Sequence, residues 1–144
     1  MPYCATSDIQ ALITPAMVLQ LTDDDKDNSP DSSVIDSRIQ MADTIIDSKL
    51  AQKHQVPFTV VPSLIKEISS RITAYLLYER KTLGEIPQSI IDMRKMAMDW
   101  LDQIAAGEMQ LPVSSVSPST TTWKNQSNKT SDSKMFTDEI LESF

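Results

Sequence analysis

One segment dominates the sequence: VPFTVVPSLIKEISSRITAYLLYERK, residues 56–81. Two prolines, Pro57 and Pro62, lie near its start. Each proline ring fixes its own φ and disfavours helical backbone at the residue before it. Residues 56–61 are therefore predicted to form an extended linker, with a short strand as the alternative. A helix can begin only after the second proline.

That helix is predicted to run from Ser63, in the N-cap position, to Arg80. Apolar residues recur through it with a 3.6-residue period, as in an amphipathic helix. They are Leu64, Ile65, Ile68, Ile72, Tyr75 and Leu76. Its end is apolar on every side, so it must be covered on more than one face, by another helix of the chain or by another copy. We favour another copy and predict Tyr75, Leu77 and Tyr78 as residues of an oligomer interface.

Two further long helices are predicted on either side of the central one. The first covers residues 33–53, where Ile35 begins an apolar stripe of helical period. The second covers residues 88–106 and is ended by Gly107. Gly84 is expected to cap the central helix, and the loop between Gly84 and this last helix is short, as between antiparallel neighbours.

Two short helices are predicted before the first long one. Thr6 or Ser7 is expected to cap a helix that runs to Ile13. Thr14, followed by a proline, has the pattern of a second helix start. The expected fold is therefore all-α, a compact bundle of three long and two short helices over residues 1–111.

The remaining residues form a predicted C-terminal arm. Residues 112–134 include seven serines and four threonines. A segment of this composition has too little apolar surface to offset the entropy lost on ordering, so we expect an extended tether. Residues 135–144 have the pattern of a short docking helix that needs a groove on another chain, because it is too short to persist alone. The predicted docking residues are Trp123, Phe136, Ile140, Leu141 and Phe144.

The composition excludes several classes of protein. A net charge of −7 argues against gripping nucleic-acid phosphates or anionic membranes. Cys4 is the only cysteine and His54 the only histidine, so one chain cannot assemble a disulfide, a Cys-His metal cluster or a catalytic Cys-His or Ser-His pair. We expect neither enzyme activity nor a cofactor. The first residues lack the pattern of a signal peptide, which fits a protein of the reducing cytoplasm.

An acidic loop covers residues 22–32. Asp23, Asp25 and Asp27 have the 1, 3, 5 spacing of a calcium-binding EF-hand loop, but position six is Asn28 rather than glycine and position twelve is Val34 rather than glutamate. We therefore expect no bound metal. We predict that Asp23, Asp24, Asp25 and Asp27 belong to a solvated acidic loop, with contact to a basic patch on a partner as the alternative.

Several motifs together carry a family resemblance. They are MPYCATSDIQALI at residues 1–13, LTDDD at 21–25, ADTIIDSKLA at 42–51, the segment at 56–81, and MAMDWLDQIAAGEMQL at 96–111. With these motifs the chain resembles a family of small virion proteins from Mu-like bacteriophages and prophages, which are similar in layout to the head-tail adaptor proteins of other long-tailed phages.

The resemblance implies a helical subunit of a dodecameric ring in the neck of the virion, assembled in the cytoplasm of the bacterial host. The ring would lie beneath the portal protein, pass double-stranded DNA without binding it specifically, and dock the next connector or the tail-terminator protein. In such a ring the acidic loop, with Asp23, Asp24, Asp25 and Asp27, would line the channel. A tail-completion or stopper protein is an alternative within the same class.

Other interpretations stay open. The apolar end of the central helix can be the core of a lone bundle, and the arm can be an unstructured end. A small acidic protein-binding module is the main competing class. A helix-turn-helix protein would need a basic recognition helix, which neither long helix supplies.

Overall fold

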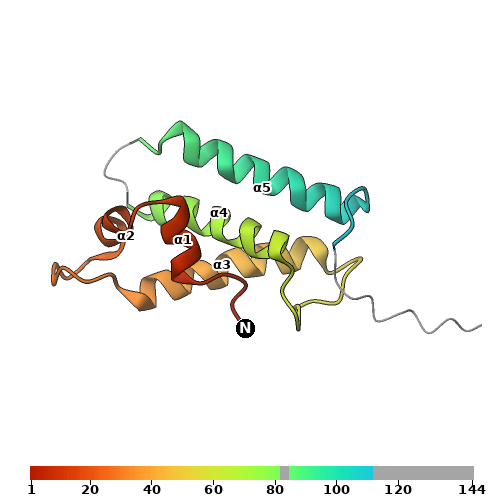
Figure 1. The fold of residues 1–144 in the computed structure, drawn as a ribbon, viewed down its shortest axis with the longest axis horizontal. Helices are drawn as coiled ribbons and strands as arrows, with labels where there is room; N and C mark the ends of the chain where they lie inside the picture. The colour runs from red at the N-terminus through yellow and green to blue at the C-terminus, as the bar shows by residue number, and fades with distance from the viewer. Residues whose placement is uncertain (82–84, 112–144) are drawn as a thin grey trace, which may run out of the picture. The chain divides into compact units, whose positions relative to one another are not determined.

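The computed structural model describes residues 1–81 and 85–111, and these residues form five α-helices and no strand (Figure 1). The helices are α1 (Thr6–Leu12), α2 (Pro15–Thr22), α3 (Ser32–Leu50), α4 (Ser63–Arg80) and α5 (Gln88–Ala106). This confirms the predicted all-α bundle of three long and two short helices. Gly84, the predicted tether at residues 112–134 and the predicted docking helix at residues 135–144 lie outside the described residues.

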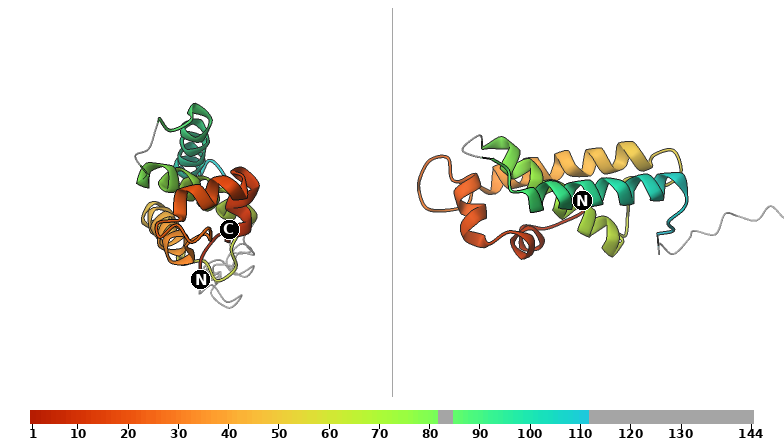
Figure 2. Two further views of the ribbon diagram at one scale, coloured as in Figure 1. Left: turned by 90° about the vertical axis from the view of Figure 1, so that its left-hand side faces the viewer. Right: turned by 90° about the horizontal axis from the view of Figure 1, so that it is seen from above.

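Helix α4 occupies the centre of the bundle. It contacts each of the other four helices. In Figure 1, α5 lies along its upper side and α3 along its lower side, while Figure 2 shows α1 and α2 against a third side. Within the described residues, the bundle is therefore organised around α4.

Small polar side chains let other elements approach α4 closely. Ser69, Ser70 and Thr73 are all buried. Burying a hydroxyl is costly unless it makes a hydrogen bond, and here the helix backbone supplies acceptors. The Ser70 hydroxyl donates to the Glu67 carbonyl at 2.9 Å, and the Thr73 hydroxyl donates to the Ser69 carbonyl at 2.8 Å.

The apolar end of α4 is covered by the chain itself. Leu77 is 0% exposed and belongs to a buried cluster that includes Ile9 of α1 and Val18 of α2. Its prediction as an oligomer-interface residue is therefore wrong, because side chains of the same copy, from α1, α2, α3 and α5, form the cluster in which it is buried. Tyr75 and Tyr78 are only half-buried, so their place in an interface stays a prediction.

Most helix boundaries agree with the sequence patterns. The bounds of α4 and α5 are as predicted, Gly107 ends α5 with a positive φ of 86°, and residues 56–61 form a linker rather than a strand. The first long helix ends at Leu50, three residues early, and the chain continues in a turn in which the Lys53 amide donates to the Leu50 carbonyl at 3.0 Å, a bond of i, i−3 rather than α-helical spacing.

The caps differ more. Thr14 caps α2 as predicted, since its hydroxyl accepts from the Met17 amide at 3.3 Å. The N-cap of α4, however, is Pro62 rather than Ser63. For α1 the N-cap is Ala5, one residue before the predicted start, and its amide donates to the Asp8 carboxylate at 2.8 Å. An acid in the first turn here replaces the predicted hydroxyl cap.

None of the helices within residues 1–81 and 85–111 combines the length and the apolar character that crossing a bilayer requires.

Candidate functional site

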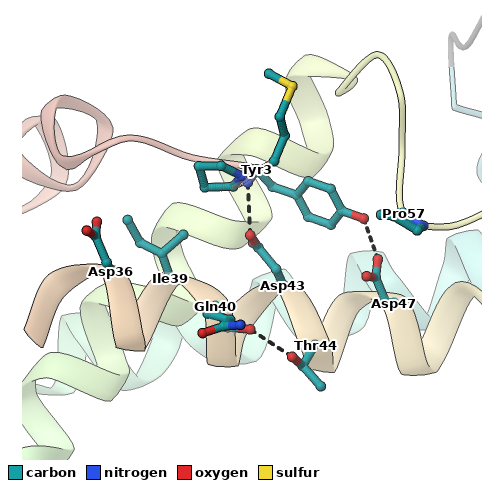
Figure 3. Close-up of a pocket in the computed structure, with 10 residues that line it drawn as sticks. Tyr3, Asp36, Ile39, Gln40, Asp43, Thr44, Asp47 and Pro57 are labelled. Atoms are coloured by element: carbon teal, nitrogen blue, oxygen red, sulfur yellow. Dashed lines mark hydrogen bonds between the residues drawn. The ribbon is translucent and has the colours of Figure 1, made fainter. Parts of the chain in front are cut away.

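A pocket of about 560 Å³ lies between the N-terminal segment and one face of α3 (Figure 3). Three carboxylates of α3 line it: Asp36, Asp43 and Asp47. They are spaced at i, i+7 and i+11, which places them on one face of a helix. We call this the α3 pocket. Sequence analysis missed it, although the spacing of the three acids was a usable signal.

Tyr3 holds the N-terminal segment over this pocket. Its amide donates to Asp43 Oδ2 at 2.9 Å, and its hydroxyl donates to Asp47 (Figure 3). The same hydroxyl accepts from the Phe58 amide at 3.1 Å, and the two aromatic rings pack with centroids 5.7 Å apart. Tyr3 therefore ties together the N-terminal segment, α3 and the linker before α4. Burial, reinforced by the Asp47 carboxylate, raises the pKa of Tyr3 to about 12, so the hydroxyl keeps its proton.

Asp43 connects the α3 pocket to α4. The Ser69 hydroxyl donates to Asp43 Oδ1 at 2.7 Å and also lies 3.3 Å from the Cys4 sulfur. Burial raises the pKa of Asp43, against hydrogen bonds from Ser69 and Tyr3 that act to lower it. Burial likewise raises the pKa of the Cys4 thiol, which therefore stays protonated at neutral pH.

The raised pKa of Asp43 gives a pH-dependent contribution to stability. The folded protein holds this proton more tightly than the unfolded chain, so the contribution is present below the ordinary carboxyl pKa of 3.8 and is lost as pH rises through the raised value. We expect the free energy of unfolding of wild type, minus that of Asp43→Asn, to fall as pH rises from about 4 towards neutrality. Urea denaturation across that range measures the difference, and parallel pH profiles would contradict the raised pKa.

The acidic loop is fastened by the end of α4. Arg80 donates to the Leu21 carbonyl at 3.0 Å and pairs with Asp24. Lys81 donates to the carbonyls of Gln20 and Asp23. Free carbonyls at the end of a helix attract cations, so both residues cap the C-terminal end of α2. This role of Arg80 and Lys81 was not predicted.

Within the loop, three of the four predicted acidic residues lie together. The carboxylate oxygens of Asp23, Asp25 and Asp27 lie within 4.8 Å of one another, whereas Asp24 is engaged by Arg80. Backbone amides approach the same carboxylates: that of Asn28 donates to Asp23 at 3.3 Å. The loop therefore presents concentrated negative charge at a defined position beside α2 and α4.

We expect this loop to contribute little to folding. Replacing Asp23, Asp24 and Asp25 together with asparagine is expected to change the free energy of unfolding by less than about 1 kcal/mol, because the pair with Arg80 lies at the surface and the backbone bonds from Lys81 are kept. Thermal denaturation measures this, and a large fall in melting temperature would show that the loop is structural.

Calorimetry on the wild type is expected to detect no stoichiometric calcium site of micromolar affinity, because the loop lacks the glycine at position six and the glutamate at position twelve of an EF-hand.

The predicted docking residues of the arm, Trp123, Phe136, Ile140, Leu141 and Phe144, lie outside the described residues and stay predictions.

Comparison with known proteins gives the family. The sequence matches the model of the family described as Bacteriophage Mu, Gp36 over residues 3–129. It is also similar to the protein named Gene product J of Escherichia phage Mu, with 29% identity over 109 residues, which are 75% of this chain and 74% of that protein. The resemblance to Mu-like phage proteins is thereby confirmed. Because the match includes the helical bundle from Tyr3 onward and covers well over half of the sequence, the chain belongs to the Bacteriophage Mu Gp36 family.

Proposed function

We propose that this phage protein is a structural head-tail connector of the adaptor type. In this proposal it forms a ring under the portal protein, extends the DNA channel, and docks the next connector or the tail terminator in the neck of the virion. Its work is assembly and passage of DNA, without a catalytic step. Family membership supports the phage context. The position in the virion rests on the resemblance in layout to the head-tail adaptor proteins of other long-tailed phages.

The observation that carries the channel role is the acidic loop fastened to α4. Three carboxylates within 4.8 Å of one another form a strongly negative surface, and Arg80 and Lys81 hold the loop on the central helix of the bundle. A channel for DNA has to repel phosphates so that the duplex slides instead of sticking. A negatively charged loop that the central helix holds in place is suited to line such a channel.

The bundle also suits a building block that meets its neighbours through outer surfaces. Leu77 is buried within one copy, in a cluster with side chains from the other helices of the bundle, so the subunit can fold before it assembles. Contacts between copies are then left to residues that the bundle leaves partly exposed. Tyr75 and Tyr78 are among them.

The proposal is tested by co-producing the full chain with the portal protein of the same phage. Native mass spectrometry is expected to show a ring, with twelve copies as the expected number from the resemblance, and cryo-electron microscopy is expected to place the acidic loops towards the bore. If the density of this protein lies in the ring after the one that contacts the portal, the stopper or tail-completion function is supported instead. A chain that stays monomeric and does not bind the portal would overturn the connector function and favour a small protein-binding module.

A further inference from the structure

Helix α5 has a second stripe besides the one it buries in the bundle. Its core residues are Ile90, Ala97, Leu101 and Ile104. Ile91, Arg94, Lys95 and Met98 follow at i, i+3, i+4 and i+7, the spacing of one helix face. Ile91 is 39% exposed, Arg94 and Lys95 are also exposed, and Met98 is half-buried. We call these four residues the α5 stripe.

The α5 stripe combines apolar surface with uncompensated positive charge. Neither Arg94 nor Lys95 forms an ion pair with an acidic residue of the described part of the chain. The Arg94 guanidinium lies over the ring of Tyr75, 4.5 Å from its centroid, which extends the surface onto α4. A surface of this kind suits a partner with carboxylates beside apolar groups.

The α3 pocket has the complementary character. Within residues 1–81 and 85–111, Asp36, Asp43 and Asp47 form no ion pair with a lysine or arginine. Exposed Pro57 lines the pocket, and so does Met1, which is 94% exposed. The positive charge of the Met1 α-amino group attracts the Asp43 carboxylate. Asp36 is exposed to solvent, so its carboxylate is accessible to a partner. The α3 pocket is therefore an acidic hollow with an apolar rim.

These two surfaces belong to different edges of the bundle. In Figure 1, α5 lies above α4 and α3 lies below it, although α3 and α5 also contact each other. The α3 pocket lies on the face of α3 that the N-terminal segment covers (Figure 3). Two different, complementary surfaces on one chain make a heterologous contact, which generates a ring when the rotation closes. DNA is a poor occupant of the α5 stripe, because Arg94 and Lys95 are only two basic side chains and gripping a duplex requires a larger cluster of them.

We propose that the α5 stripe of one copy docks in the α3 pocket of the next copy, with Lys95 and Arg94 facing Asp36 and its neighbouring carboxylates. Ile91 then packs against the apolar rim at Met1 and Pro57. This inference rests on the proposed ring and identifies the two faces that build it. Buried charge pairs between copies also fix the register of neighbours and suppress wrong contacts.

A charge exchange tests the contact in the full chain. Lys95→Glu alone and Asp36→Lys alone are each expected to weaken ring formation about tenfold or more, because each places like charges opposite one another. The double variant Lys95→Glu/Asp36→Lys is expected to recover rings, since the pair is restored with reversed signs. Glu108→Lys, an exposed charge reversal beyond the end of α5 and more than three helical turns from Lys95, serves as the matched control and is expected to assemble like wild type. Native mass spectrometry and sedimentation velocity measure the distribution of rings and monomers, alone and on the portal.

The outcomes separate this contact from the proposed function. If wild type forms rings and both single variants form them equally well, the assignment of the two faces is wrong while the connector function stands. If both singles fail and the double variant fails too, without loss of helical circular dichroism, the direct pairing is wrong. If wild type forms no ring alone or on the portal, both proposals fall. Should Lys95→Glu reduce folding, Lys95→Ser removes the charge more mildly and is expected to weaken rings in the same direction.

Discussion

Replacing Leu77 with alanine is expected to lower the free energy of unfolding by about 2–5 kcal/mol, the range for a leucine removed from a packed core. Leu77 is 0% exposed and lies where α4 meets the two short helices. Small domains are commonly stable by only about 5–15 kcal/mol, so the loss is a large share of the total. Urea denaturation followed by circular dichroism measures it.

Two variants serve as controls for this result. Ile91→Ala, at a position 39% exposed on α5, is expected to cost roughly 0.5–1 kcal/mol. Tyr78→Ser removes a half-buried side chain at the end of α4 and is expected to affect assembly more than folding. If Leu77→Ala instead left stability unchanged and abolished assembly, the burial of Leu77 within one copy would be refuted and its place in the oligomer interface restored.

Deleting residues 135–144 is expected to abolish binding to the partner ring while the helical bundle stays folded. Within residues 1–81 and 85–111 the five helices already enclose a buried core, so the bundle is expected to fold without the last ten residues. The predicted terminal helix, with its apolar residues at Phe136, Ile140, Leu141 and Phe144, has a reason to form only where a groove on another chain receives it. The 23 residues from 112 to 134 can reach roughly 75 Å if extended at about 3.3 Å each, far enough for a neighbouring subunit or the portal.

The measurement compares wild type and the truncated chain for two properties. Circular dichroism and thermal denaturation are expected to agree between them, and pull-down with the portal is expected to succeed only for wild type. A full-length variant with the four apolar residues changed to serine is the matched control and is expected to fail in the same way. Normal assembly of the truncated chain into connected heads would refute docking by the arm.

The sequence alone determined the positions of the central and last helices. Their boundaries depend on local chemistry: Pro57 and Pro62 delay the start of α4, and Gly107 supplies the positive φ that ends α5. The periodic apolar residues within each helix identified the buried side. Signals of this kind lie within one or two turns of the residues that they affect, so no knowledge of the rest of the fold was needed.

The caps show where local reasoning is weakest. Several neighbouring residues can satisfy the same free amide, and the sequence did not distinguish a hydroxyl from the Asp8 carboxylate at the start of α1. Pro62 is the N-cap of α4 for a related reason: its backbone is extended, and its carbonyl accepts the first helical hydrogen bond, from the Lys66 amide at 3.0 Å. These differences move helix ends by one residue and leave the fold unchanged.

Only the tertiary structure decided what covers the apolar end of α4 and where the acidic residues meet. Periodicity shows that Leu77 must be buried, but a helix of the same chain and a helix of another copy bury the same area and give the same pattern. The α3 pocket depends on Tyr3 reaching Asp43 and Asp47, 40 and 44 residues away, and the acidic loop depends on Arg80 reaching Asp24 across 56 residues. Such contacts arise from how helices pack, and packing is set by the whole set of buried surfaces rather than by the spacing of residues along any one of them.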